Sequence, residues 1–360
     1  MGRGTDAASV GQASRLSHLS NHLFPVKCVT ASTEGQRLAA ALGRSETGVT
    51  PVLLQRSGSV SRAEIAGRAG QRILLLLALL VFTAGCATTP PARVRRQADI
   101  EYTRAGGEPL RLDLYTPEHA AGPLPVLVWI HGGSWRWGSK APCSIAHLAT
   151  NGFAVASIEY RLTGVAKFPA QLDDCRAAVR WVREHGAAYG LDGNRIAAYG
   201  ASAGGHLAAL VGLTGGPPNG TNAARVQAVC AYYPPTDLDQ LVTARWARRA
   251  TWASVGKLLG GPLDHNRDRA AVASPMRYVH AGAPPFFFMH SMDDWLVPMA
   301  QSEQLHTALQ RVGVESTHVP VPGKRHGIDA PPAVEKQIVE FFRRHLQSGL
   351  PAVSTVPGGK

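Results

Sequence analysis

Beyond Ala98 the sequence alternates between two hydrophobic patterns. Short apolar runs with the composition of β-strands are separated by longer segments in which apolar residues recur every three or four positions, as in amphipathic helices. The central runs are apolar almost throughout, which is typical of parallel strands that are covered on both faces. We therefore expect an α/β fold with a mostly parallel, eight-stranded sheet and helices on both of its faces.

The first two runs are amphipathic and predict an antiparallel hairpin at one edge of this sheet. The expected strands are Ile100 to Thr103, Leu110 to Tyr115, Val126 to Ile130, Ala154 to Ile158, Ile196 to Tyr199, Ala228 to Tyr232, Phe286 to Met289 and Ser316 to Val319. The expected helices are Ala170 to His185, Ala203 to Leu213, Ala300 to Val312 and Pro332 to Leu346.

Residues 237–283 interrupt this alternation. They are rich in Trp and Arg, and the stretch is too long for an ordinary loop in a compact domain. We interpret it as a small helical cap insertion. Trp246 and Trp252 within it, together with Trp295, are suited either to a substrate pocket or to core packing.

Charge and cysteine content bear on the possible partners. Residues 1–96 hold twelve basic and four acidic side chains, whereas the remainder holds 25 and 21, so most of the net charge of +12 lies near the N-terminus. The expected domain, residues 97–348, has no basic run with interleaved aromatic residues, and we expect no nucleic-acid partner. The cysteines, at positions 28, 86, 143, 175 and 230, lack zinc-site spacing, so no metal is implied. Cys143 and Cys175 are either a disulfide pair or free thiols.

An export signal is predicted upstream of the domain. The ten apolar residues 73–82 follow Arg68 and Arg72 and precede Thr83-Ala84-Gly85-Cys86, which is the layout of a secretory signal peptide. The run is shorter than the roughly 18 to 20 apolar residues that a membrane-spanning helix needs. The residues before Cys86 resemble a bacterial lipobox, so Cys86 is a candidate for lipidation and membrane anchoring.

The expected signal peptide spans residues 60–86 and is followed by a short tether at residues 87–96. Residues 1–59 have no apolar periodicity. They are interpreted as a start assigned too far upstream, with Val60 as the initiator, or as a disordered extension. Residues 349–360 are rich in Pro and Gly and predict a flexible tail. The expected location is beyond the bacterial inner membrane, in the periplasm or at a membrane as a lipoprotein.

The strongest motif is Gly200-Ala201-Ser202-Ala203-Gly204, which lies between a predicted strand and a predicted helix. A sharp strand-to-helix turn raises the Ser202 hydroxyl above the sheet edge, and glycine on both sides leaves room where a side chain would collide. The positive N-terminal end of the following helix favours negative charge at this place. We expect Ser202 to be a catalytic nucleophile.

A second motif, His131-Gly132-Gly133-Ser134-Trp135, directly follows a predicted strand. Acyl transfer places negative charge on a carbonyl oxygen, and preorganised backbone amides stabilise that charge. Gly132 and Gly133 lack Cβ atoms and can bring their amides close, while the amide of Ala203 completes an oxyanion hole from the opposite side. The amide of Ser134 is an alternative to one of the two glycines.

The expected general base is His326, in a loop just after the last predicted strand. It has two rivals. His318 lies within that strand, where the pleat sets its direction. His206 follows Ser202 by four residues but is turned along the helix, away from the turn that projects the hydroxyl.

The carboxylate that orients the base is expected after the strand Phe286 to Met289. Asp293 and Asp294 are adjacent there, and the spacing to Val297-Pro298 favours Asp294. Its carboxylate would hold the imidazole tautomer and stabilise the imidazolium without taking the proton.

Together these blocks resemble the α/β-hydrolase fold of the esterase and lipase branch, above all the group of bifunctional feruloyl and acetyl xylan esterases. More distantly they resemble hormone-sensitive-lipase-like esterases. The resemblance covers about residues 97–346. The matching segments are His131 to Trp135, Glu159 to Leu162, Phe168 to Asp174, Gly200 to Leu207, Asp294 to Pro298 and Gly323 to Gly327.

Two positions depart from the family patterns. Ser134 replaces the third glycine of the lipase His-Gly-Gly-Gly motif, which tells against the hormone-sensitive-lipase branch. Ser291 replaces the glycine that usually follows histidine in the acid loop. The segment from Glu159 to Asp174 is interpreted as structural, behind the site.

The resemblance implies a serine esterase that uses Ser202, Asp294 and His326 and needs no cofactor. Its substrates would be carboxylic esters with small or medium acyl groups, or esters linked to carbohydrate. One alternative is an arylformamidase-like amide hydrolase, whose family also uses a His-Gly-Gly-x-Trp loop. A peptidase of the prolyl-oligopeptidase type is disfavoured, because Ala203 stands where that branch usually has an aromatic residue. A third alternative is a non-catalytic, esterase-like surface lipoprotein.

Overall fold

The computed structural model describes residues 93–216, 224–243, 249–323, 326–327 and 329–347. The described residues all belong to the unit Ala87–Lys360. The predictions for residues 1–59 and 60–86, including lipidation of Cys86, lie outside the described residues. The same is true of Trp246 and of the tail at 349–360.

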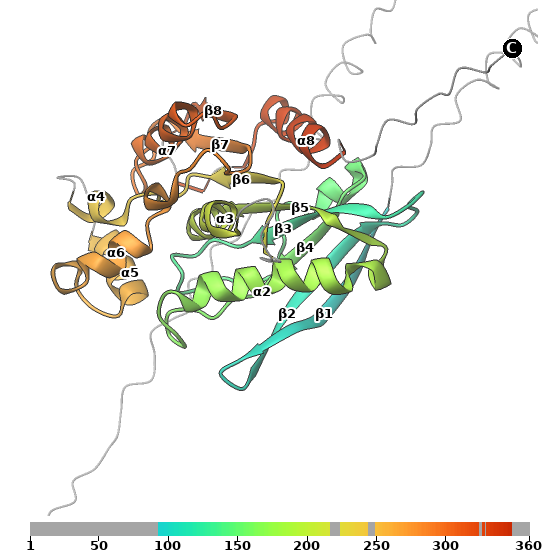
Figure 1. The fold of residues 1–360 in the computed structure, drawn as a ribbon, viewed down its shortest axis with the longest axis horizontal. Helices are drawn as coiled ribbons and strands as arrows, with labels where there is room; N and C mark the ends of the chain where they lie inside the picture. Colours follow the sequence, from blue (N-terminus) through green and yellow to red (C-terminus); the bar gives the residue numbers. More distant parts are fainter. Residues whose placement is uncertain (1–92, 217–223, 244–248, 324–325, 328, 348–360) are drawn as a thin grey trace, which may run out of the picture. The chain divides into compact units, whose positions relative to one another are not determined.

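Eight strands form one sheet in the order β1-β2-β4-β3-β5-β6-β7-β8 (Figure 1). β1 pairs antiparallel with β2, and β2 with β4, whereas all other neighbours are parallel. The mostly parallel, eight-stranded sheet and its antiparallel edge hairpin are therefore confirmed. The strands are β1 (Val94–Ala105), β2 (Glu108–Pro117), β3 (Leu124–Ile130), β4 (Ala154–Ile158), β5 (Leu191–Ala201), β6 (Ala228–Tyr232), β7 (Phe286–Ser291) and β8 (Ser316–Val321).

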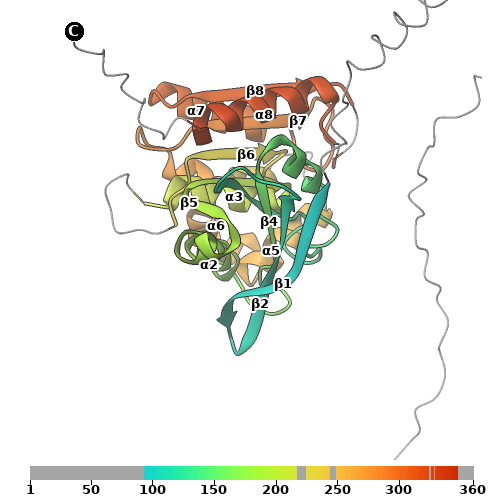
Figure 2. The same ribbon diagram turned by 90° about the vertical axis from the view of Figure 1, so that its right-hand side faces the viewer.

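Helices cover both faces of the sheet (Figures 1 and 2). Side chains of α2, α3 and α7 pack into the core on one face, and side chains of η1 and α8 pack into the core on the other. This layering confirms the expected α/β architecture. The helices outside the insertion are η1 (Ala146–Asn151), α2 (Ala170–His185), η2 (Gly186–Tyr189), α3 (Ala203–Thr214), α7 (Ala300–Arg311) and α8 (Pro332–Gln347).

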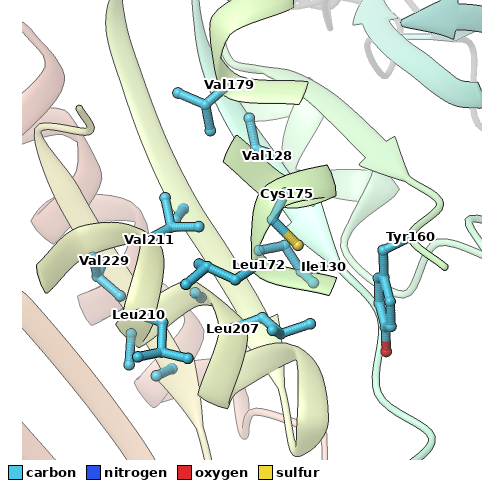
Figure 3. Packing of buried hydrophobic residues seen from close by; sticks show 14 of the residues in the cluster. Val128, Ile130, Tyr160, Leu172, Cys175, Val179, Leu207, Leu210, Val211 and Val229 are labelled. Atoms are coloured by element: carbon cyan, nitrogen blue, oxygen red, sulfur yellow. The ribbon is translucent and has the colours of Figure 1, made fainter. Parts of the chain in front are cut away.

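The central strand β3 shows how the sequence produces these layers. All of its residues are buried, and alternate side chains of a strand point to opposite faces. Val128 and Ile130 lie among side chains of α2 and α3 (Figure 3), whereas Leu127 and Trp129 join the core under α8. A strand that packs on both faces has no solvated side, and its sequence is therefore apolar throughout.

The insertion between β6 and β7 is helical, which agrees with its sequence pattern. It contains α4 (Leu238–Thr243), α5 (Arg249–Leu259), η3 (Leu263–His265), α6 (Arg267–Val272) and η4 (Pro275–Tyr278). Val255 and Leu258 of α5 are buried in the same core as α3. Trp252 and Trp295 are 59% and 46% exposed, so neither of them is a core residue.

The first strand begins earlier than the sequence pattern predicts. β1 starts at Val94, so residues 94–96, which were expected to end the tether, belong to the sheet instead. These residues pair along the backbone with the end of β2, and the guanidinium of Arg96 lies 2.7 Å from the carboxylate of Asp113 on that strand. Arg96, which the sequence pattern assigned to the tether, therefore belongs to the edge hairpin.

The cysteines in the described residues are free thiols. Cys143 is half-buried and Cys175 is buried, so the two are not joined by a disulfide. Burial raises the pKa of Cys143 to about 11, and the group is therefore a protonated thiol at neutral pH with little nucleophilic character.

A buried carboxylate anchors the edge hairpin. Asp113 is fully buried and accepts hydrogen bonds from the guanidinium of Arg96 and, at 3.0 Å, from the amide of Asp99. Its Oδ1 also lies 3.2 Å from Nζ of Lys140, which is itself 8% exposed. Burial by itself would raise the pKa of Asp113, but these donors lower it below its ordinary value. The carboxylate therefore stays ionised and holds two cations at the edge of the sheet.

We expect Asp113→Ala to lower the free energy of unfolding by about 2 kcal/mol, because Arg96 loses its carboxylate partner and Lys140 is left with Asp99 and Glu159. Glu101→Ala is the control. It removes the exposed partner of Arg104 and should cost less than about 1 kcal/mol. Urea denaturation measures both values, and equal losses would contradict the anchoring role.

Candidate active site

β5 and α3 meet at a sharp turn that carries Ser202. Its backbone angles are φ +54° and ψ −119°, which are unusual for a residue other than glycine. The turn brings backbone segments very close together. A Cβ atom on Gly204 would lie 1.9 Å from the carbonyl oxygen of Ile130, and one on Gly200 would lie 2.3 Å from that of Gly204. Glycine is therefore required on both sides of Ser202, for the steric reason inferred from the motif.

His326 lies between Ser202 and Asp294. Its Nε2 is 2.8 Å from Oγ of Ser202, and its Nδ1 is 2.7 Å from Oδ2 of Asp294. An ionised carboxylate only accepts hydrogen bonds, so Nδ1 carries the ring proton and Nε2 is left to accept from the serine hydroxyl. Three side chains that are distant in the sequence thus form one hydrogen-bonded series.

Asp294 is held by the loop that follows β7. Its Oδ1 accepts the amides of Leu296 at 2.8 Å and Val297 at 3.0 Å. Burial by itself would raise the pKa of Asp294, but hydrogen bonds from His290, from His326 and from the Val297 amide together lower it below its usual range. Asp294 is therefore an anion at neutral pH, although its side chain is out of contact with solvent.

His290 is a neighbour of this carboxylate that the sequence did not single out. It is fully buried at the end of β7. Its Nδ1 lies 2.7 Å from Oγ of Ser302, and its Nε2 lies 2.8 Å from the carbonyl oxygen of Val297 and 3.4 Å from Oδ2 of Asp294. His290 thereby fastens the loop that presents Asp294.

Ser291 links the acid loop to the loop that carries His326. Its hydroxyl donates to the carbonyl oxygen of Gly323 at 2.7 Å, and the same oxygen accepts the amide of Asp293 at 3.1 Å. The sequence signal for this link was the replacement of the usual glycine by Ser291. A glycine at position 291 would lack the side-chain hydrogen bond, and the oxygen of Gly323 would keep the bond from the Asp293 amide.

The loop after β3 approaches Ser202 from another side. A Cβ atom on Gly132 would lie 3.5 Å from the Ser202 Cβ, and Gly133 has φ +113°, which favours glycine. Within the described residues the amides of Gly132, Gly133 and Ala203 donate no hydrogen bond, and the amide of Ser134 likewise has no acceptor there. Backbone donors without acceptors thus lie on both chain segments next to Ser202, as an oxyanion hole requires.

The segment from Glu159 to Asp174 supports this loop from behind. The ring of Tyr160 stacks on that of His131 at 4.3 Å, and its hydroxyl donates to the His131 carbonyl oxygen at 3.0 Å. Arg161 in turn pairs with Asp174 at 2.7 Å. These contacts agree with a structural role for the segment.

The rival residues are not bonded to the serine hydroxyl. The two ring nitrogens of His206 contact the indole of Trp135 and the carbonyl oxygen of Ala273. His318 lies in β8 with its ring 5.8 Å from that of His306. Asp293 is exposed. Among these candidates in the described residues, His326 contacts the Ser202 hydroxyl and Asp294 contacts His326, whereas His206, His318 and Asp293 do neither.

Metal binding and membrane spanning have no visible basis in the described residues. No group of three His, Cys, Asp or Glu side chains there is arranged to hold a metal ion. No helix among them is both long and apolar enough to cross a membrane.

A mostly parallel sheet with a serine at the turn after β5, an aspartate after β7 and a histidine after β8 defines an α/β-hydrolase. The BD-FAE family matches residues 112–309, more than half of the chain. The chain belongs to this family, which confirms the esterase resemblance seen in its motifs.

Known relatives are esterases. Esterase LipC of Mycobacterium tuberculosis is 30% identical over 333 residues, which cover 86% of this chain and 82% of LipC. Esterase LipQ of the same species is 32% identical over 262 residues, and this match covers 67% of the chain but 59% of LipQ. A solved structure of a truncated carbohydrate esterase from gut microbiota has a TM-score of 0.63 and 27% identity, over 72% of this chain and 99% of that structure.

We expect Gly204→Ala to lower the free energy of unfolding by about 3 kcal/mol or more, because the new Cβ would overlap the carbonyl oxygen of Ile130. Gly190→Ala is the matched control. Its φ is +72°, but nothing lies within 4 Å of the new Cβ, so only backbone strain of about 1–2 kcal/mol is expected. Urea denaturation compares the two, and similar losses would show that the close approach at Gly204 is not limiting.

Proposed function

We propose that the chain is a serine hydrolase that cleaves carboxylic esters, with Ser202 as nucleophile, His326 as general base and Asp294 as the orienting carboxylate. The observation that carries the proposal is the pair of contacts made by His326, at 2.8 Å to the hydroxyl and 2.7 Å to the carboxylate. The esterase relatives support ester substrates. No step in the reaction calls for a cofactor.

Acylation begins when Nε2 of His326 takes the proton of Ser202 and Oγ attacks the ester carbonyl carbon. The imidazolium that forms lies against Asp294, whose negative charge favours it and whose hydrogen bond keeps the ring in place. When the tetrahedral intermediate collapses, Nε2 gives the proton to the departing alcohol, and the acyl group stays on Oγ. Water then attacks the acyl-enzyme with the same histidine as base, which releases the acid and restores Ser202.

The oxyanion that develops in both steps is bound by the amides of Gly132, Gly133 and Ala203 in this proposal, with Ser134 as the alternative to one glycine. Their lack of acceptors in the described residues supports this role. Donors that are already oriented stabilise the transition state more than the substrate and therefore raise kcat.

We expect Ser202→Ala to lower kcat for p-nitrophenyl acetate by roughly 10⁴-fold or more, and Asp294→Asn to lower it by roughly 10⁴-fold because the ring loses its correct tautomer. Circular dichroism checks that both variants are folded. The matched control is Ser139→Ala, which changes an exposed serine and should leave the rate unchanged. A fluorophosphonate probe should label the wild type and not Ser202→Ala; absence of labelling in the wild type would favour the non-catalytic lipoprotein.

The proposed substrates are esters of small or medium acyl groups, including esters linked to carbohydrate. The structural likeness to a carbohydrate esterase supports the second group. The loop His131-Gly132-Gly133-Ser134-Trp135 also fits an arylformamidase-like amide hydrolase, which is the second candidate.

A substrate panel separates these candidates. We expect p-nitrophenyl acetate, acetylated xylan or methyl ferulate to be cleaved with a kcat/KM at least about tenfold above that for N-formylkynurenine, a difference of about 1.4 kcal/mol in transition-state binding. The measurement is initial rates over a range of substrate concentrations, with Ser202→Ala as the blank. Preference for N-formylkynurenine would replace the esterase proposal by the amide hydrolase.

A further inference from the structure

We propose that His206 is a positioning residue that couples the helical insertion to the loop of the oxyanion hole. The inference deepens the proposed function and rests on it, because it concerns the same oxyanion. His206 lies in the first turn of α3, and its amide donates to the carbonyl oxygen of Ser202 at 2.9 Å. Its side chain points away from the triad and is fully buried.

The contacts of His206 define its tautomer. Nδ1 lies 3.1 Å from Nε1 of the Trp135 indole, and the two rings are nearly perpendicular. An indole N–H can only donate, so Nδ1 must be the acceptor and the ring proton must be on Nε2. Nε2 then donates to the carbonyl oxygen of Ala273 at 2.7 Å. The ring is neutral and bridges two segments that are far apart in the sequence.

A depressed pKa agrees with this geometry. Burial lowers the pKa of His206 to about 4, so the ring is uncharged near neutral pH. A neutral imidazole has one donor and one acceptor, and both are used.

The first of the two segments is the loop of the oxyanion hole. Gly133, Ser134 and Trp135 have φ values of +113°, +54° and +58°, and two of these residues carry side chains that disfavour such angles. The loop therefore needs external contacts to keep its shape. Trp135 supplies them, because its carbonyl oxygen accepts the amide of Thr163 at 2.8 Å and its buried indole donates to His206.

The second segment is the C-terminal end of the insertion. Ala273 follows α6 and is fully buried. The next residue, Ser274, accepts the amide of Leu238 on its hydroxyl at 2.9 Å, and the amide of Met276 donates to the carbonyl oxygen of Thr236 at 3.1 Å. The beginning and the end of the insertion are thus fastened together where His206 contacts it.

His206 consequently joins the foot of the insertion to the amides that would bind the oxyanion. A displacement of either segment lengthens one of the two hydrogen bonds. The oxyanion exists in the transition state and not in the bound ester, so the loss of this link lowers kcat more than it raises KM.

The test compares three substitutions with p-nitrophenyl acetate as substrate. His206→Leu removes both hydrogen bonds and should lower kcat about 10- to 100-fold, with KM within about threefold of the wild type. Trp135→Phe removes the indole donor, keeps an aromatic ring and should lower kcat to a similar extent. His206→Gln offers a carbonyl oxygen that can accept from Trp135 and an NH2 group that can donate to Ala273, and it should restore kcat to within about threefold of the wild type.

A double variant and a matched control complete the design. His206→Leu combined with Trp135→Phe should lose no more activity than the more affected single variant, because the hydrogen bond that Trp135→Phe removes is already absent in His206→Leu. Trp181→Phe is the control. It changes another buried tryptophan, which stacks on His185 on α2, and it should destabilise the fold without changing kcat.

The possible outcomes distinguish the two proposals. Activity that survives in Ser202→Ala overturns the proposed function. An inactive Ser202→Ala together with a His206→Leu variant that keeps its kcat, or that loses activity through KM alone, overturns the coupling and leaves the function standing. Multiplied losses in the double variant also overturn it. If His206→Leu does not fold, Trp135→Phe and His206→Gln carry the same test.

Discussion

The backbone around Ser202 packs directly against the ends of two neighbouring strands, and the arrangement of the site depends on this contact. A Cβ atom on Gly204 would overlap the carbonyl oxygen of Ile130 at the end of β3, and one on Gly205 would lie 2.8 Å from that of Tyr232 at the end of β6. The amide of Ser202 also donates a hydrogen bond to the carbonyl oxygen of Tyr232 at 2.9 Å. Because β3, β5 and β6 are adjacent and parallel, Ser202 and the glycine loop after β3 emerge side by side at one edge of the sheet.

Asp294 and His326 reach the same edge from the next strands along the sheet. β7 and β8 are parallel neighbours, so the loops that follow them carry Asp294 and His326 toward Ser202. A buried carboxylate needs donors to remain charged, and the amides after Asp294 together with His290 provide them. Ser291 then joins the two loops through Gly323. Residues 290–297 therefore both keep the Asp294 carboxylate charged and hold the loop after β7 against the loop that carries His326.

The helical insertion between β6 and β7 is also tied to the loop after β3 by hydrogen bonds. Its two ends meet at Ser274, and His206 connects that junction to Trp135 in the glycine loop. Trp252, on α5 of the insertion, lies outside the core and leaves much of its surface to solvent. The insertion thus combines a buried foot, which is tied to the core of the domain, with an exposed side chain on its outer surface.

Much of the fold, and the side chains that form the hydrogen-bonded series of Ser202, His326 and Asp294, could be predicted from the amino-acid sequence. Apolar periodicity reports which face of each element is buried, and the runs at β3 to β7 therefore predicted a parallel sheet covered by helices. The glycines around Ser202 report a steric demand that is local to one turn, and the order of serine, aspartate and histidine along the chain follows from the order of the strands. The choice of Asp294 rested on its spacing to Val297-Pro298, and the choice of His326 on its place in the loop after the last strand. Both side chains lie in the hydrogen-bonded series with Ser202.

Contacts between distant segments left no comparable trace in the sequence. β1 extends into the expected tether by pairing with β2 and places Arg96 beside Asp113. Cys143 and Cys175 are separate thiols, and His206 bridges Trp135 and Ala273. Each of these depends on strand register and loop path, which are set when the whole chain packs. A periodic pattern indicates whether a side chain is buried or exposed. Which side chain it contacts across the core is decided only by the packing of the whole fold.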